Sequence, residues 1–144
     1  MDLVMPGIAG QYSQSSGGVS LVAERNALET WAQLLEGTEI ASLLIPDGLD
    51  DHPDRWAALR AIELRPLADD SRVTLAGEAE TLTIVGGRAA CRLMAAHLRN
   101  LARAPYRVTS ASVPTHADIE YYDTHPYLTP SDRWLTVELQ SDEG

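Results

Sequence analysis

Two alternating segments near the end of the chain constrain its fold most strongly. Residues 117–122 and residues 135–140 each alternate an apolar or aromatic side chain with a second, mostly polar, one. A period of two residues is typical of a β-strand that buries one face and exposes the other. This register places Tyr121 toward the core and Tyr122 toward solvent. The connecting segment, Asp123–Arg133, is too long for a tight turn and rich in apolar and aromatic groups, so we expect an ordered loop.

Length and composition predict one globular domain spanning residues 1–144. The hydrophobic fraction of 44% and the charged fraction of 22% are ordinary for a folded domain with one core. No apolar run approaches the roughly 20 residues that a membrane helix needs. The segment Met1–Gly10 has no basic region, so we expect no signal peptide. Cys91 is the only cysteine, which excludes an internal disulfide and favours a cytoplasmic protein.

The net charge narrows the class of partner. Twenty-one acidic residues against eleven basic residues give a formal charge of -10 and a pI near 4.6. Such a surface repels nucleic acid and anionic membranes and attracts basic partners. We therefore expect no nucleic acid and no membrane as a partner. Solubility alone explains the acidic charge as well as a basic partner does.

The chain contains two similar halves, approximately residues 18–77 and 80–140. The match aligns Val19–Arg25 with Leu82–Arg88, Trp31 with Met94, residues 62–64 with 119–121, and residues 73–75 with 135–139. Each half then reads as strand, helix, strand, strand. Since neither half can bury the apolar stripe of its helix alone, we expect both helices to pack on one face of a shared sheet. This predicts an α+β two-layer sandwich with a mostly antiparallel sheet, built by internal duplication.

Several elements follow from local patterns. Helices are expected between Glu24 and Glu36 and from about Arg88 to Arg103, and an antiparallel meander is expected over residues 61–85. A helical turn opening at Pro53 would carry Trp56. The inner face of the second helix is predicted to comprise Ala90, Leu93, Met94, His97, Leu98 and Leu101. An acidic patch lies between Asp47 and Asp54.

No residue pattern carries catalysis. Cys91 falls on the buried side of its helix, where a structural thiol is expected, and His97 on an apolar helix face is expected to be a hydrogen-bonded core residue. His116, Asp118 and Glu120 share one strand face and His125 could approach them, but the spacing lacks a metal-binding motif. Nucleophile elbows and phosphate loops are absent from the sequence. We predict no catalytic residue, no metal and no cofactor.

The aromatic and acidic residues of the loop are the strongest functional signal. Tyrosine and tryptophan beside carboxylates are typical of an interface with an acidic rim. The alternative is that the rings only close one end of the sheet, and for Tyr127 the two interpretations are equally good. The predicted partner-binding residues are Glu120, Tyr122, Asp123, His125, Tyr127, Asp132 and Trp134.

This part of the sequence resembles immunity protein family 32, the predicted antidotes of bacterial polymorphic toxin systems. The resemblance rests on His116–Tyr122, His125–Leu128 and Leu135–Leu139, with support from Leu82–Gly87 entering a helix that carries Leu93 and Leu98. It covers about residues 80–139. The family often has a glycine before the loop histidine, where this chain has Thr124. The resemblance implies a small cytoplasmic protein that binds and neutralises a cognate toxin, without assigning toxin contacts to particular residues.

The sequence thus favours a binding protein rather than an enzyme. The leading hypothesis is an immunity protein that blocks its toxin stoichiometrically, and the acidic charge would suit a basic toxin such as a nuclease. The first alternative is a regulatory module that binds a small ligand or associates with itself. The second is a hydrolase of unrecognised type.

Overall fold

The computed structural model describes residues 1–46, 56–108 and 114–141. Within these ranges the chain forms two helices and two mixed five-stranded sheets. The helices are α1 (Arg25–Leu35) and α2 (Arg88–Arg103). The first sheet has the order β1 (Asp2–Val4), β4 (Ala41–Leu44), β6 (Ala61–Leu67), β8 (Thr81–Gly87), β7 (Thr74–Ala76). The second has the order β5 (Trp56–Ala58), β2 (Ile8–Ser13), β3 (Gly18–Ala23), β10 (Trp134–Leu139), β9 (His116–Ile119).

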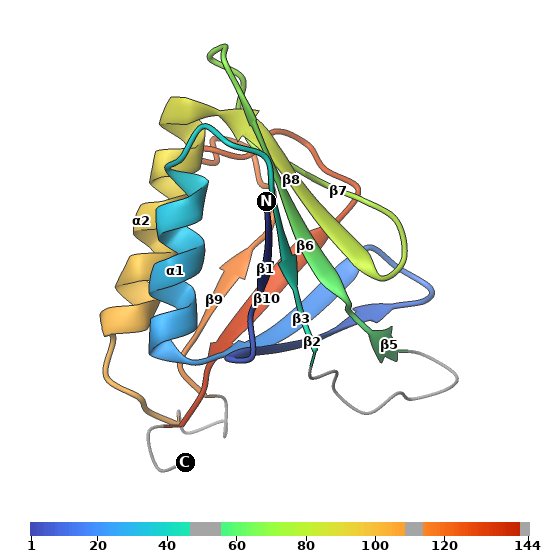
Figure 1. Cartoon of the computed structure of the whole chain (residues 1–144), viewed down its shortest axis with the longest axis vertical. Coiled ribbons are helices and arrows are strands. Elements are labelled where there is room, and N and C mark those ends of the chain that lie inside the picture. The colour runs from blue at the N-terminus through green and yellow to red at the C-terminus, as the bar shows by residue number, and fades with distance from the viewer. Residues whose placement is uncertain (47–55, 109–113, 142–144) are drawn as a thin grey trace.

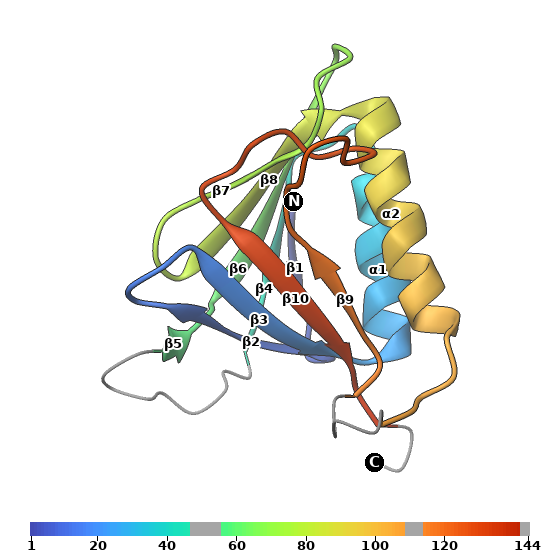
Figure 2. The same cartoon turned by 180° about the vertical axis from the view of Figure 1, so that it is seen from behind.

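The architecture is an α+β sandwich, as predicted. The two helices lie side by side along one flank of the molecule, and the sheets make up the rest (Figures 1 and 2). Alternate residues of the long strands are buried, for example Ile62 and Leu64 in β6 and Leu135 and Val137 in β10. The inner faces of both sheets therefore contribute to one continuous core. No helix within the described ranges is long and apolar enough to cross a membrane.

The prediction of one shared sheet is wrong, because the strands divide between two sheets. Most strand pairs are antiparallel, as predicted, but β6 pairs with β8, β3 with β10 and β1 with β4 in parallel. The meander predicted for residues 61–85 is also absent, because β8 lies between β6 and β7. The strand alternation was recognised correctly, but local patterns do not reveal which strands pair when the connections are long.

The strand order relates the two halves of the chain. Four neighbouring strands of the first sheet, in the order β4-β6-β8-β7, correspond in position to β9-β10-β3-β2 of the second sheet. Each helix connects a strand of one sheet to a strand of the other. By position in the sheets β6 corresponds to β10 and β4 to β9, so the predicted matching of residues 62–64 with 119–121 is wrong. The matching of Trp31 with Met94 agrees with this topology. An origin by internal duplication stays a prediction.

Each helix buries a stripe of apolar side chains, with Trp31 and Met94 fully enclosed. The predicted helix bounds are confirmed to within one residue. Leu93 was expected on the inner face of α2 but is exposed. Its neighbours Ala90, Met94 and Leu98 complete the buried stripe, and Leu93 falls outside its edge. His97 is half-buried and forms a hydrogen bond, which places it at the border of the core.

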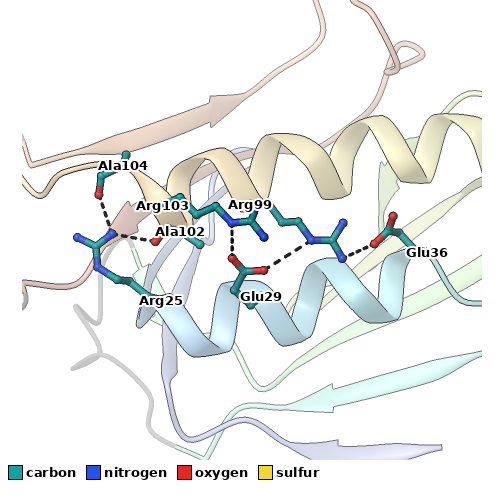
Figure 3. A network of polar contacts seen from close by, with 7 residues as sticks. All are labelled: Arg25, Glu29, Glu36, Arg99, Ala102, Arg103 and Ala104. Carbon is teal, nitrogen blue, oxygen red and sulfur yellow. Dashed lines mark hydrogen bonds and ion pairs between the residues drawn. The ribbon is translucent and has the colours of Figure 1, made fainter.

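Polar side chains join the two antiparallel helices across their outer seam (Figure 3). Arg25 at the start of α1 donates hydrogen bonds to the carbonyl oxygens of Ala102 (2.8 Å) and Ala104 (2.6 Å), at the end of α2. These carbonyls have no partner within the helix, so Arg25 acts as a cap supplied by the neighbouring helix. The seam continues with ion pairs from Arg103 to Glu29 and from Arg99 to both Glu29 and Glu36.

These ion pairs contribute little to the stability of the helix pair. The hydrogen bond from Arg99 is the main reason that the pKa of Glu36 lies below its usual range. The side chains remain substantially exposed to water, where ion pairs typically contribute less than about 1 kcal/mol. Helix association therefore depends chiefly on the apolar stripes beneath them.

Two short strands near the edges of the sheets differ from what the sequence predicted. The segment around Trp56 was predicted as a helical turn but forms strand β5, paired with β2 through Ser13 and Trp56. The alternation there is only three residues long, too short to distinguish a strand from a turn. Strand β1 was not anticipated for the same reason. The acidic patch between Asp47 and Asp54 lies outside the described residues.

Trp31 offers a test of the core. Its side chain is fully buried, and its indole N–H finds no hydrogen-bond partner among the described residues. We expect Trp31→Ala to lower the free energy of unfolding by about 3–5 kcal/mol, because it leaves a large cavity. Trp31→Phe should cost only about 1 kcal/mol, because it keeps most of the ring and removes the unpaired donor. Urea unfolding of both variants measures this, and equal costs for the two would contradict it.

Candidate functional site

The loop between β9 and β10 is ordered by backbone hydrogen bonds to the first sheet. The amide of Val73, just before β7, donates to the carbonyl oxygen of Tyr127 (2.8 Å), and the amide of Thr129 donates to the carbonyl oxygen of Val73 (2.9 Å). Val73 and Leu128 thereby form an isolated parallel bridge. A loop that belongs to the second sheet is thus fastened to the edge of the first, which confirms that it is ordered.

Side chains complete this attachment. Arg72 donates from Nε to the carbonyl oxygen of Leu128 (3.2 Å) and from Nη2 to that of His125. Ser131 accepts a hydrogen bond from the amide of Leu75 in β7 (3.0 Å) and donates one to the carbonyl oxygen of Thr129 (2.9 Å). The loop backbone is therefore held by both backbone and side-chain contacts from residues 72–75.

His125 is an internal support of the loop rather than a contact residue. The side chain is buried, and its Nδ1 accepts hydrogen bonds from the amides of Tyr127 (3.2 Å) and Leu128 (2.9 Å). Two donors aimed at Nδ1 require that this nitrogen carries no proton, so the ring is neutral with its proton on Nε2. Its ring faces the loop's own backbone and is 5% exposed, so the predicted direct contact between His125 and a partner stays a prediction that this arrangement does not favour.

Tyr127 is likewise buried, which decides between its two interpretations in favour of a ring that closes the end of the sandwich. Its hydroxyl oxygen lies 2.9 Å from Nδ1 of His97 on α2, and its ring meets His125 edge-on with 4.6 Å between ring centroids. Burial raises the pKa of the Tyr127 hydroxyl, so it stays protonated at neutral pH. Tyr127 thus connects the loop to the helix layer.

The exposed crest of the loop is Glu120–Thr124. Tyr122 is 57% exposed, and its ring rests against the buried His125 with 4.8 Å between centroids. Tyr121 was predicted to face the core but is 37% exposed. Strand β9 ends at Ile119, so the alternation that would turn Tyr121 inward does not continue. Glu120 and Asp123 are exposed beside these two rings, which gives an aromatic crest with acidic neighbours.

Asp132 and Trp134 occupy the other end of the loop. Trp134 begins β10, is paired with Gly18 of β3, and is partly exposed on the outer face of the second sheet. A Cβ atom at Gly18 would lie 3.3 Å from the indole nitrogen, so the glycine makes room for this ring. The next pair along, Leu135 with Ile119, places Glu120 opposite Trp134. Asp132 is exposed, whereas the intervening Arg133 is buried and was not singled out from the sequence.

The other chemical candidates do not assemble into a reactive site. Cys91 is buried, its thiol donates to the carbonyl oxygen of Gly86 (3.5 Å), and burial raises its pKa. His116 and Asp118 form a pair at 3.4 Å on the outer face of the second sheet, away from the inward-facing His125. Within the described part of the chain, no three His, Cys, Asp or Glu side chains are grouped as metal ligands.

Thr124 adopts a backbone conformation that is unfavourable for threonine, and substituting it tests whether the loop imposes this conformation. Its φ of 67° lies in the left-handed region that favours glycine and disfavours a β-branched residue. We expect Thr124→Gly to raise the free energy of unfolding by about 0.5–1 kcal/mol, after allowance for the greater freedom of glycine in the unfolded chain. Asp123→Gly is the matched control, because Asp123 has no positive φ and should lose stability. Denaturant unfolding decides between the two signs.

His125 predicts a pH dependence of the loop. Burial lowers its pKa below the ordinary 6.5, and the charges of His97 and Arg72 lower it further. The unfolded chain therefore binds the proton more readily than the native state. Stability should be complete above about pH 6.5 and fall as the pH decreases through the native pKa. Protonated Nδ1 could no longer accept from Tyr127 and Leu128.

Urea unfolding between pH 7.5 and 5.0 measures this effect. His125→Asn keeps an acceptor but does not titrate, so its stability should vary less with pH than that of the wild type. A residual slope is expected from His97, whose pKa burial also lowers. Identical slopes for wild type and His125→Asn would show that the His125 acceptor role does not control the loop.

Comparisons with protein-family models, with curated proteins and with solved structures find no match for this chain. The resemblance to immunity protein family 32 therefore stays a prediction based on its sequence strings.

Proposed function

We propose that this protein is a cytoplasmic immunity protein that neutralises a cognate bacterial toxin by stoichiometric binding. The observation that carries the proposal is Tyr122, a large aromatic side chain held exposed on a loop whose backbone is fixed. Binding through such a loop loses little conformational entropy, because the loop is already ordered before contact. Tyrosine is also among the residues that most often dominate binding energy at interfaces.

The surroundings of Tyr122 favour a basic partner. Glu120 and Asp123 flank it, and the outer face of the second sheet adds Asp118 and Glu138, which are exposed or half-buried. Together with the formal charge of -10, these carboxylates would accelerate encounter with a positively charged protein. A basic toxin domain such as a nuclease fits this field, whereas nucleic acid or an anionic membrane does not.

The affinity required by this role is high. An antidote must silence trace amounts of toxin, which corresponds to a dissociation constant near the nanomolar range, or about -12 kcal/mol. A few buried anchors surrounded by a polar rim can supply this free energy. We assign the anchors to Tyr122 and Trp134 and the rim to Glu120, Asp123 and Asp132. His125 and Tyr127 contribute by holding the loop in place.

The proposal predicts a specific loss on removing the Tyr122 ring. We expect Tyr122→Ala to weaken binding to the cognate toxin domain by about 2 kcal/mol or more, mainly through faster dissociation. Folding stability should change little, because the ring is more than half exposed. Calorimetric titration and stopped-flow kinetics measure binding, and growth rescue on co-expression measures neutralisation.

Val4→Ala is the matched control. Val4 is as exposed as Tyr122 but lies on β1, at the opposite edge of the first sheet from β7, which contacts the loop. It should leave binding unchanged. Asn in place of Asp123 should instead slow association, with an effect that fades at high salt. Full-strength binding by a folded variant with alanine at both Tyr122 and Trp134 would place the interface elsewhere.

A small-ligand-binding module is the second candidate. The observation that favours it is a polar hollow next to the buried guanidinium of Arg133. The two functions predict different behaviour of the purified protein. An immunity protein acts only on its toxin, whereas a ligand-binding module recognises a small molecule without any partner protein.

A further inference from the structure

Arg133 connects the two sheets through its guanidinium group. The residue lies just ahead of β10 in the second sheet, and its Nη1 and Nη2 atoms donate to the carbonyl oxygens of Thr81 (2.7 Å) and Ala79 (2.8 Å) at the β7–β8 turn of the first sheet. Only 7% of the residue is exposed. The side chain is therefore a buried cation between two structural units.

The positive charge of Arg133 is not balanced within the described residues. Both hydrogen-bond partners are neutral carbonyls, and no carboxylate of the described residues lies within ion-pair distance. Burial lowers the pKa of the guanidinium, but arginine remains protonated in proteins. Two of the five N–H donors of the group are used, which leaves three without a protein acceptor in this part of the chain. A buried cation without a counter-charge is unfavourable unless solvent or a ligand balances it.

The guanidinium borders a hollow of about 630 Å³, a volume that suits a small ligand. The hollow lies where the turn between β2 and β3 meets the turn between β7 and β8, and the two turns are side by side in both views (Figures 1 and 2). Tyr12 forms one wall, with its ring centroid 5.9 Å from the Arg133 guanidinium carbon. Ser13, Gln14 and Ser16 add polar groups from the first turn.

The first turn leaves the hydroxyl of Ser16 able to donate a hydrogen bond. Ser13 Oγ accepts from the amides of Ser15 (3.3 Å) and Ser16 (3.1 Å), and Ser16 Oγ accepts from the amide of Gly18 (3.3 Å). Because these oxygens accept from the backbone, the Ser16 hydroxyl proton is left to donate outward. The turn therefore presents a hydroxyl donor on the same hollow as the guanidinium.

The backbone of the second turn contributes to the geometry around Arg133. Ala79, whose carbonyl oxygen accepts from Arg133, has a φ of 48° in the left-handed region. Such a conformation is unfavourable for a residue other than glycine and persists only where the surroundings impose it. Here it aims a carbonyl at the guanidinium and so fixes the direction of the remaining donors.

We propose that this hollow binds a small organic anion through a carboxylate group. The planar guanidinium of Arg133 matches the geometry of a carboxylate, Ser16 supplies a further donor, and the Tyr12 ring packs against the apolar part of the ligand. Asp132 also lines the hollow and disfavours a second negative charge, so a monocarboxylate is preferred over a multiply charged anion. The site uses no loop-crest residue and does not require a toxin.

Titration of the ¹⁵N-labelled full chain with sodium acetate, followed by amide chemical shifts, tests this proposal. Acetate should perturb the amides of Ser16, Gly17 and Ala79 with a millimolar dissociation constant, while sodium chloride at equal ionic strength should not. Asp132→Asn should tighten acetate binding about three- to tenfold, because it removes a nearby like charge. Arg133→Lys keeps the charge but loses the planar fork, and should weaken binding about fivefold or more.

Inorganic phosphate separates carboxylate recognition from general attraction of anions. Tighter binding of phosphate than of acetate would overturn the assignment to monocarboxylates. Shifts no larger than those with chloride, or shifts unchanged by Asp132→Asn, would overturn the site. Because Arg133→Lys also alters a contact between the sheets, its thermal melt is recorded first. If it is unfolded, Ser16→Ala replaces it, and an unchanged acetate affinity for that variant would count against the proposal.

Discussion

The parallel pairing of β6 with β8 and of β3 with β10 is the constraint on which the rest of the structure depends. Each pair joins a strand from the first half of the chain to one from the second. If the halves separated, four central strands would become edges with unpaired backbone groups, which is a costly arrangement. The helices connect the sheets in opposite directions and so bury their apolar stripes only when both sheets are complete. We therefore expect the two halves of the chain to fold and unfold together.

The loop between β9 and β10 and the β7–β8 hairpin also stabilise each other. Arg72, beside the first sheet, donates to loop carbonyls, while Arg133, at the end of the loop, donates to carbonyls of the β7–β8 turn. The loop and the β7–β8 hairpin thus hold each other through reciprocal arginine contacts. His125 and Tyr127 fill the space between them and α2. This explains how a long connection can present Tyr122 at a fixed position.

The elements that depend on local sequence were predictable, and those that depend on distant partners were not. Both helices, the β9 and β10 strands and the ordered loop follow from periodicity and turn residues. The position of β8 between β6 and β7 depends on which distant strands pair. An alternation of apolar and polar residues within one strand does not specify its partner. At the site, the sequence predicted the ordered loop and the exposure of Tyr122, but it could not decide whether Tyr127 is buried. Its burial depends on His97 in α2 and on the Arg72 contacts, both far away in the chain.

Arginine usage links the internal structure to the surface charge. All eleven lysine or arginine positions are arginine, and several of these side chains connect helices, strands or loops to one another. Arg25 and Arg133 donate to carbonyl oxygens, and Arg99 and Arg103 pair with Glu29. Planar guanidinium groups suit this task, because each can bridge two acceptors at once. These four guanidinium groups are engaged within the fold, whereas Glu120 and Asp123 are exposed beside Tyr122. A basic partner at the proposed interface would meet these exposed carboxylates, so the placement of charge in the fold also shapes the electrostatic field around the loop crest.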